Sequence, residues 1–342
     1  MGAVTGGAVS GPEKIPSRDR GAARLHSQIL WFVALCGALL ISRWALFPRL
    51  LITFDEINFA LAAHEFNPRL SQPQPPGYPL FVGLLKLLSF FTSNMEATFL
   101  LAALLVSAVA LAALWRLCDL MAGPELGIFG ALLLLFNPAF WLSALTNPVR
   151  LCFAAGAAVV GLCVWEACAR KSAAWLALGA AALGAAAGAR PALPLLMAPL
   201  MLWAAGRIRL RWKAAAVTLL CFGAAVATWL PALIAASGGG REFVAMLRGY
   251  SQNQMSGTSL LFGAALGDAL QMAWKAIAWS CLGALSWAWA LPIVLWLRRT
   301  AFDRCAARFL ALWFFPGLLF YAAFHVADPD HTLAIVPATC VA

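Results

Sequence analysis

The sequence predicts an all-α membrane protein: a polytopic bundle of about ten transmembrane helices, with one further helix lying at the membrane interface. Hydrophobic residues make up 63% of the 342 residues and charged residues only 11%, whereas about 25% of a soluble domain is charged. Apolar runs of around twenty residues, the length that crosses a bilayer, recur along nearly the whole chain. These runs do not alternate in polarity as the strands of a transmembrane barrel do.

The charge pattern argues against a nucleic-acid-binding protein, and the cysteines argue against a disulfide-bonded or zinc-binding one. The net charge is +10, but lysine and arginine gather in clusters between apolar runs. That is typical of cytoplasmic loops under the positive-inside rule, so we expect membrane lipids and no nucleic acid as partners. The nine cysteines are scattered without a CxxC pair, so we expect neither a disulfide nor a zinc site.

The N-terminal segment 1–25 is rich in Gly, Ala, Ser and Arg and is expected to be disordered and cytoplasmic. Residues 26–342 are expected to form the transmembrane domain, whose first span covers 29–47. A cleaved signal peptide is the alternative reading. Arg43 interrupts the run and no small-x-small cleavage site follows it, which favours an uncleaved span.

The first extracytoplasmic loop, 48–95, contains the apolar stretch 77–91. If this stretch crossed the membrane, every later basic cluster would face outward, against the positive-inside rule. The stretch is also short for a span, and Lys86 divides it. We therefore expect a helix lying at the interface.

The remaining spans follow from that assignment. They are expected at 96–115, 126–143, 150–169, 173–188, 191–206, 214–236, 270–297 and 308–326. The pair 173–188 and 191–206 is preferred to one long tilted helix, because Gly188 and Pro191 favour a break and a single helix would turn the cluster at Arg207 outward. A last apolar segment begins after His331 and stops short of a span, so we expect a C-terminally incomplete domain.

Five polar segments then face the extracytoplasmic side. They are the loop with Asp55 and Glu56, the run from Asn147 to Arg150, the turn at Arg190, the long loop 237–267 and the segment 325–331. A carboxylate at such a face can accept a proton from an attacking hydroxyl. Asp55 fits this role by position, and Glu56 points elsewhere and is expected to support it. The alternative is that both acids merely cap the interfacial helix.

The order of these features resembles the GT-C class of integral membrane glycosyltransferases, in its protein-mannosyltransferase-like and lipopolysaccharide core transferase-like branches. Asp55-Glu56 and Pro75-Pro76-Gly77-Tyr78-Pro79 carry the resemblance. It implies that a sugar passes from a polyprenyl-phosphate donor to a glycan, lipid or protein acceptor, with inversion, outside a bacterial inner membrane. It also implies that Asp55 is the base or orients a metal. The candidate catalytic residues are therefore Asp55 and, in a supporting role, Glu56.

The chain departs from that class at two positions. Asn147 stands where relatives often carry an acid, and Gln74 where they often carry His or Lys. A divalent cation is therefore compatible with the sequence but not required by it. The candidates for binding the lipid phosphate are Arg150, Arg190, Arg248 and Tyr78.

Two other functions stay open at this point. One is a polytopic lipid or glycan transporter, although such proteins place ionisable residues at the bilayer midplane, whereas here most charges sit at span ends. The other is an inactive GT-C relative, which the missing second carboxylate favours.

Overall fold

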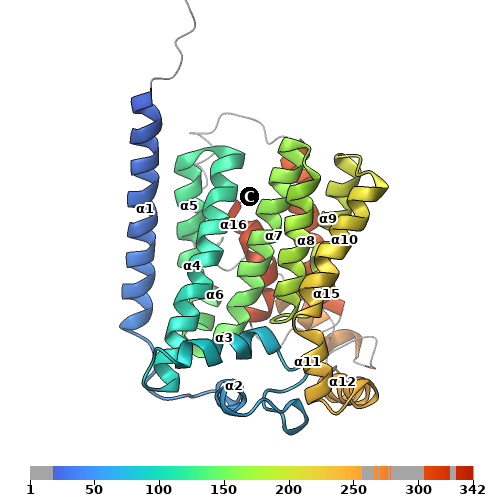
Figure 1. The fold of residues 1–342 in the computed structure, drawn as a ribbon. Helices are drawn as coiled ribbons and strands as arrows, with labels where there is room; N and C mark the ends of the chain where they lie inside the picture. The colour runs from blue at the N-terminus through green and yellow to red at the C-terminus, as the bar shows by residue number, and fades with distance from the viewer. Residues whose placement is uncertain are drawn as a thin grey trace, which may run out of the picture.

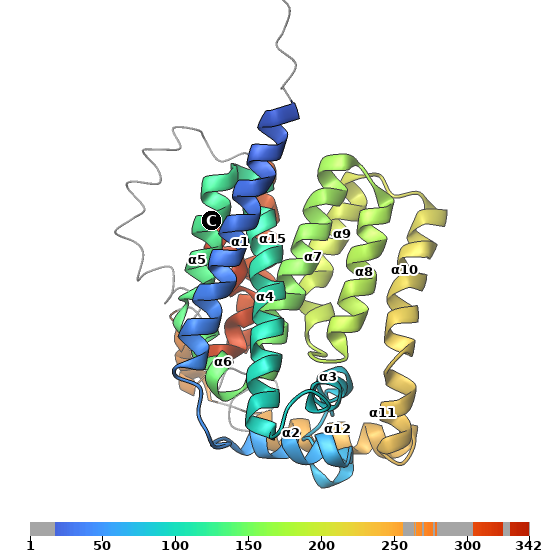
Figure 2. The same ribbon diagram turned by 60° about the vertical axis from the view of Figure 1, so that its left-hand side comes forward.

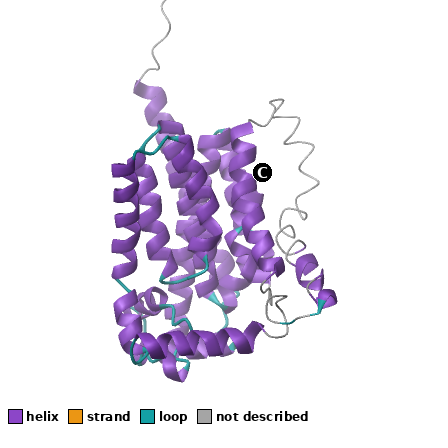
Figure 3. Cartoon of the chain, turned by 90° about the vertical axis from the view of Figure 1, so that its right-hand side faces the viewer, coloured by secondary structure: helices purple, strands orange, loops and turns teal. Residues whose placement is uncertain are grey.

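The computed structural model describes residues 18–255, 263, 265–268, 270–275, 278, 304–323 and 329–341. Among these residues the regular elements are all helices, with one isolated β-bridge between Asn67 and Gln72 (Figure 3). The predicted all-α class is confirmed. The expected span 270–297 falls mostly outside the described residues.

Roughly parallel and antiparallel helices run side by side to form the bundle (Figure 1). They are α1 (Arg18–Trp44), α4 (Met95–Ala122), α5 (Pro124–Leu135), α6 (Pro138–Thr146), α7 (Leu151–Arg170), α8 (Ala173–Ala187), α9 (Leu193–Arg207), α10 (Trp212–Ala227) and α15 (Arg304–Ala323). Helix α4 packs on α5 and α7, α7 on α8, and α8 on α10. Helix α1 lies along α4, as Figure 2 shows.

Three helices of the described chain are long and apolar enough to cross a membrane: Met95–Ala122, Pro148–Arg170 and Trp212–Ala236. Helices α5 and α6 pass the same test as a pair and are bent by 53° at their junction. Shorter apolar helices occupy Ile29–Trp44, Ala173–Ala187 and Leu193–Arg207. The total of about ten spans stays a prediction.

Helix α1 begins at Arg18, so its first turns extend into the segment 1–25 that was expected to be disordered. Alanine and arginine are good helix formers, which lets the helix continue beyond the apolar run.

Three helices lie across the long axes of the bundle at one of its ends (Figures 1 and 2). They are α2 (Phe54–His64), α3 (Pro79–Ser89) and α12 (Gly240–Met255), and α11 (Leu230–Ala236) continues α10 to the same end. Helix α3 corresponds to the apolar stretch 77–91, and its position across the bundle end agrees with the predicted interfacial helix. We call this end of the bundle the α2–α3 end.

The segment from Ala173 to Arg207 forms two helices, α8 and α9, as expected. The turn between them, 188–192, lies at the α2–α3 end (Figure 1). Small residues let neighbouring helices approach closely. A Cβ added at Gly184 of α8 would lie 2.6 Å from the Phe222 carbonyl oxygen of α10. Because successive helices alternate in direction, loops that are far apart in the sequence meet at the same end of the bundle.

Candidate active site

Helix α2 begins with a capping box that occupies Glu56. The Thr53 hydroxyl accepts a hydrogen bond from the Glu56 backbone N–H at 3.1 Å. In return, Glu56 Oε2 accepts from the backbone N–H groups of Thr53 at 2.9 Å and Ile52 at 3.1 Å. Such reciprocal bonds satisfy donors that a helix start leaves unpaired. Glu56 is only 2% exposed, and burial raises the pKa of its carboxyl while these hydrogen bonds oppose the rise.

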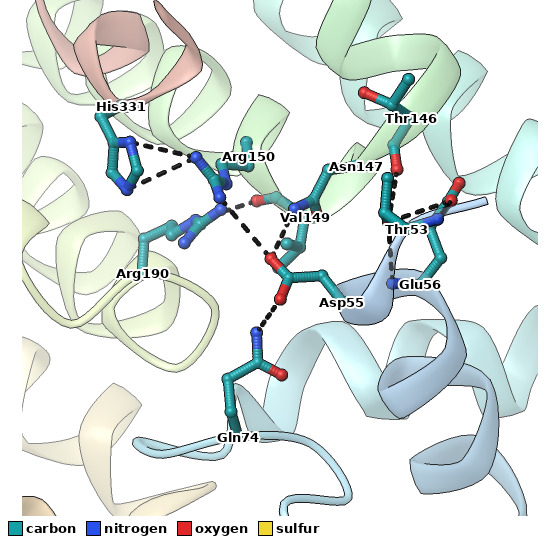
Figure 4. Close-up of polar contacts among 10 residues, drawn as sticks. All are labelled: Thr53, Asp55, Glu56, Gln74, Thr146, Asn147, Val149, Arg150, Arg190 and His331. Carbon is teal, nitrogen blue, oxygen red and sulfur yellow. Dashed lines mark hydrogen bonds and ion pairs between the residues drawn. The ribbon is translucent and has the colours of Figure 1, made fainter. Parts of the chain in front are cut away.

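Asp55, the residue before Glu56 in the same turn, points into a cluster of polar side chains (Figure 4). Its Oδ1 accepts a hydrogen bond from Gln74 Nε2 at 2.6 Å, and its Oδ2 accepts one from Asn147 Nδ2 at 2.8 Å. Arg150 Nη2 lies 3.6 Å from the same Oδ2. Each carboxylate oxygen is thus held by one amide and keeps a further lone pair for another donor.

Arg150 connects Asp55 to the C-terminal part of the described chain. It ends the 3-10 turn η2 (Pro148–Arg150), which follows α6 directly. Its Nη1 lies 3.1 Å from Nδ1 and 3.4 Å from Nε2 of His331, in the 3-10 turn η5 (Pro329–Ala334). His331 therefore belongs to the site. From the sequence, its segment was either a polar loop or a group of metal-ligating residue types, and His331 was not among the predicted site residues.

Arg190 lies behind this cluster, in the turn between α8 and α9. It is 7% exposed, and its Nε donates to the Val149 carbonyl oxygen at 3.1 Å. Its guanidinium lies over the rings of Phe153, at 4.6 Å, and Tyr78, at 5.3 Å. Stacking on aromatic faces stabilises a buried arginine. Burial raises the pKa of the Tyr78 hydroxyl, against the effect of Arg190.

The proline-rich turn before α3 fixes Gln74 and Tyr78. Gly77 has φ +97°, which a glycine adopts without strain, and a Cβ there would lie 2.6 Å from Leu233 of α11. Tyr78 has φ +43°, a left-handed conformation that costs about 1–3 kcal/mol and is concentrated at functional sites. The Leu80 N–H then donates to the Gly188 carbonyl oxygen at 3.1 Å, which joins α3 to the α8–α9 turn.

Helix α12 contributes a residue that sequence reasoning missed. Phe243 packs with Leu233 of α11 and with Trp229, the residue before that helix. Tyr250 follows two helical turns later on the same face. Burial raises the pKa of Tyr250 to about 12, and the charges of Asp55 and Arg150 act on it as well. The amphipathic pattern of α12 is the sequence signal that would have pointed to this inward-facing tyrosine.

The structure brings most of the predicted residues together. Asp55 and Arg150 are in contact, and Arg190 and Tyr78 stack beside them. Arg248 is exposed and lies on the opposite face of α12 from Tyr250. Glu56 is adjacent to Asp55, but its carboxylate belongs to the helix cap.

In the orientation they adopt here, the side chains around Asp55 do not present the oxygen ligands of a divalent cation. Magnesium and calcium prefer oxygen ligands, whereas Asp55 is surrounded by N–H donors of two amides and an arginine. The described residues contain no group of three or more His, Cys, Asp or Glu side chains that could hold a metal. His325, Asp328 and the side chain of Asp330 lie outside this description.

Comparison with known proteins gives a likeness of fold alone. No protein family matches the sequence, and no curated protein is similar to it. The similar solved structures include two of ArnT from Cupriavidus metallidurans. The one bound to undecaprenyl phosphate has a TM-score of 0.66 at 17% identity and covers 92% of this chain. The apo state has a TM-score of 0.59 at 18% identity and covers 93%.

The chain spans 59% of the length of either ArnT structure. Within that span the arrangement of helices is shared over nearly all of this chain. The expected resemblance is thereby confirmed at the level of fold: this chain shares the arrangement of helices seen in ArnT.

Proposed function

We propose that this protein is a membrane glycosyltransferase that takes a sugar from a polyprenyl-phosphate carrier, with Asp55 as the catalytic base. The observation that carries the proposal is the position of Asp55. Its carboxylate is oriented by Gln74 and Asn147, stands beside Arg150, and lies at the bundle end where short helices lie across the long ones. An ArnT structure with a similar fold is bound to undecaprenyl phosphate, which supports a polyprenyl-phosphate partner for this chain.

In the proposed reaction an acceptor hydroxyl attacks the anomeric carbon of the sugar. Its oxygen forms the new glycosidic bond, its proton passes to Asp55, and the bond from the anomeric carbon to the phosphate oxygen breaks. The electron pair leaves with the polyprenyl phosphate, and attack from the opposite side inverts the anomeric carbon. A carboxylate within hydrogen-bond reach of the hydroxyl can accelerate such a transfer by about 10²–10⁴-fold.

The arginines have separate roles in this proposal. Arg150 is half-buried and adjoins Asp55, where its charge can stabilise the phosphate as it leaves. Arg190 already donates to the Val149 carbonyl and stacks on two rings, so it holds the η2 turn and Tyr78 in place. Glu56 maintains the start of α2. Arg248, on the exposed face of α12, is left without a role in catalysis.

The function is tested by transfer of labelled sugar from a panel of polyprenyl-phosphate donors, with the wild type beside Asp55→Asn. Transfer by the wild type and its loss in the variant are expected. Equal activity in both would exclude Asp55 as base, and no transfer with any donor would favour an inactive relative or a transporter. In the same proteoliposomes, a cysteine at position 245 should react with a reagent applied outside, and one at 171 should not.

A further inference from the structure

A buried arginine at the end of α1 lies against the break between α5 and α6. Arg43 is 0% exposed. Charged residues inside membrane spans are rare, pair with backbone carbonyls or other polar groups, and are often functional. The reaction proposed above makes no use of Arg43.

The break leaves the Leu135 carbonyl oxygen without its partner in the helix, and the Arg43 guanidinium donates to that oxygen instead. In an unbroken helix the Leu135 carbonyl oxygen would accept from the N–H of Ala139. Instead, Asn137 Oδ1 accepts from that N–H at 3.0 Å and starts α6. The Leu135 oxygen then accepts from Arg43 Nη2 at 2.8 Å. A backbone group freed inside a membrane protein needs such a replacement.

Arg43 also contacts α6, the helix that follows the break. Its guanidinium carbon lies 4.5 Å from the centroid of the Trp141 ring, which belongs to α6. One side chain of α1 thus contacts the last residue of α5 and the second turn of α6. These two contacts favour the 53° bend between the helices.

The direction of α6 decides where the partners of Asp55 lie. Helix α6 ends at Thr146, whose carbonyl oxygen lies 3.3 Å from the Thr53 hydroxyl at the start of α2. The next residue, Asn147, donates to Asp55 at 2.8 Å, and Arg150 follows one turn later. A change in the bend would move both side chains relative to Asp55 (Figure 4).

We propose that Arg43 is a positioning residue for the Asp55 site: by fixing the α5–α6 bend it holds Asn147 and Arg150 against the carboxylate. This inference rests on the proposed function of the site. Arg43 itself touches no reacting atom. Its effect on catalysis passes through α6.

The test compares Arg43→Met with Arg116→Met, the same substitution at the opposite end of the bundle, where the more exposed Arg116 pairs with Asp119 at 2.7 Å. A displacement of about 1 Å in a catalytic site can lower the rate about a hundredfold. We expect R43M to lower kcat by about that factor, with a smaller change in KM, and R116M to keep the wild-type values. Equal kcat in R43M and the wild type, or equal losses in R43M and R116M, would overturn the proposal.

A second measurement does not depend on turnover. Spin labels at Leu61 of α2 and Leu142 of α6, which are 44% and 53% exposed, report the distance between these helices after replacement of the native cysteines. R43M should shift or broaden that distance, whereas R116M should not. If the wild type transfers no sugar, the proposed function fails and this distance alone decides the role of Arg43.

A variant that does not fold would leave the first comparison without a result, so Trp141→Leu provides a second perturbation. It removes the stacking partner on α6 and keeps an apolar side chain. We expect the same change in distance and a fall in kcat in the same direction. A folded W141L with the wild-type distance and kcat would contradict the proposal.

Discussion

Replacing either of two neighbouring carboxylates of α2 by its amide is predicted to affect the transfer rate very differently. Asp55→Asn should lower the transfer rate by about 10²–10⁴-fold, since an amide cannot accept the proton of the attacking hydroxyl. At 1.36 kcal/mol for each factor of ten, this is about 3–5 kcal/mol of transition-state stabilisation. Glu56→Gln should keep the rate within a factor of about three, since the glutamine oxygen can still accept the hydrogen bonds that close the helix cap.

The structure explains why both variants should fold. Gln74 and Asn147 are amides, so either can rotate to present its oxygen to the new amide nitrogen at position 55. At position 56, the amide oxygen of glutamine can accept the bonds from Ile52 and Thr53 that Glu56 Oε2 accepts now. Glutamine is a regular member of capping boxes.

The assay is single-turnover transfer of radiolabelled sugar in proteoliposomes, with thermal unfolding of each variant as the control for folding. Single-turnover conditions separate the chemical step from product release. If E56Q loses as much activity as D55N while both unfold at the wild-type temperature, Glu56 takes part in the chemistry and the assignment of roles is wrong.

Three further predictions follow from the same geometry. Gly188→Ala should destabilise the protein by about 1–3 kcal/mol, because the new methyl would lie 2.7 Å from Leu80 and 2.9 Å from Trp229; an unchanged unfolding midpoint in detergent would contradict this. Removal of divalent cations with EDTA should leave transfer unchanged, because N–H donors surround Asp55; a rate that only added Mg²⁺ or Mn²⁺ restores would speak against it. Tyr250→Phe should not alter the dependence of the transfer rate on pH below about pH 10, because burial raises the pKa of Tyr250 to about 12 and keeps its hydroxyl neutral. A fall in rate at alkaline pH that the wild type shows and the variant lacks would disprove it.

The sequence determined the helices and the end of the bundle at which their connections meet. Helix formation in a membrane follows from local apolar length, and the alternation of loops follows from the order of spans and basic clusters. Both are properties of continuous stretches of chain. The break between 173–188 and 191–206 and the helix across the bundle end were therefore predictable. The sequence also placed Asp55 and Arg150 on the same side of the membrane, but it did not show that they are in contact.

The tertiary structure decided which side chains complete the site. Gln74 and Asn147 looked like lost functional groups in the sequence, yet both donate to Asp55, the second from 92 residues away. The role of Glu56 depends on the backbone of Thr53, and that of Tyr250 on which face of α12 turns inward. Hydrogen bonds need atoms within about 3 Å. Such distances depend on how the helices pack, which no local pattern encodes.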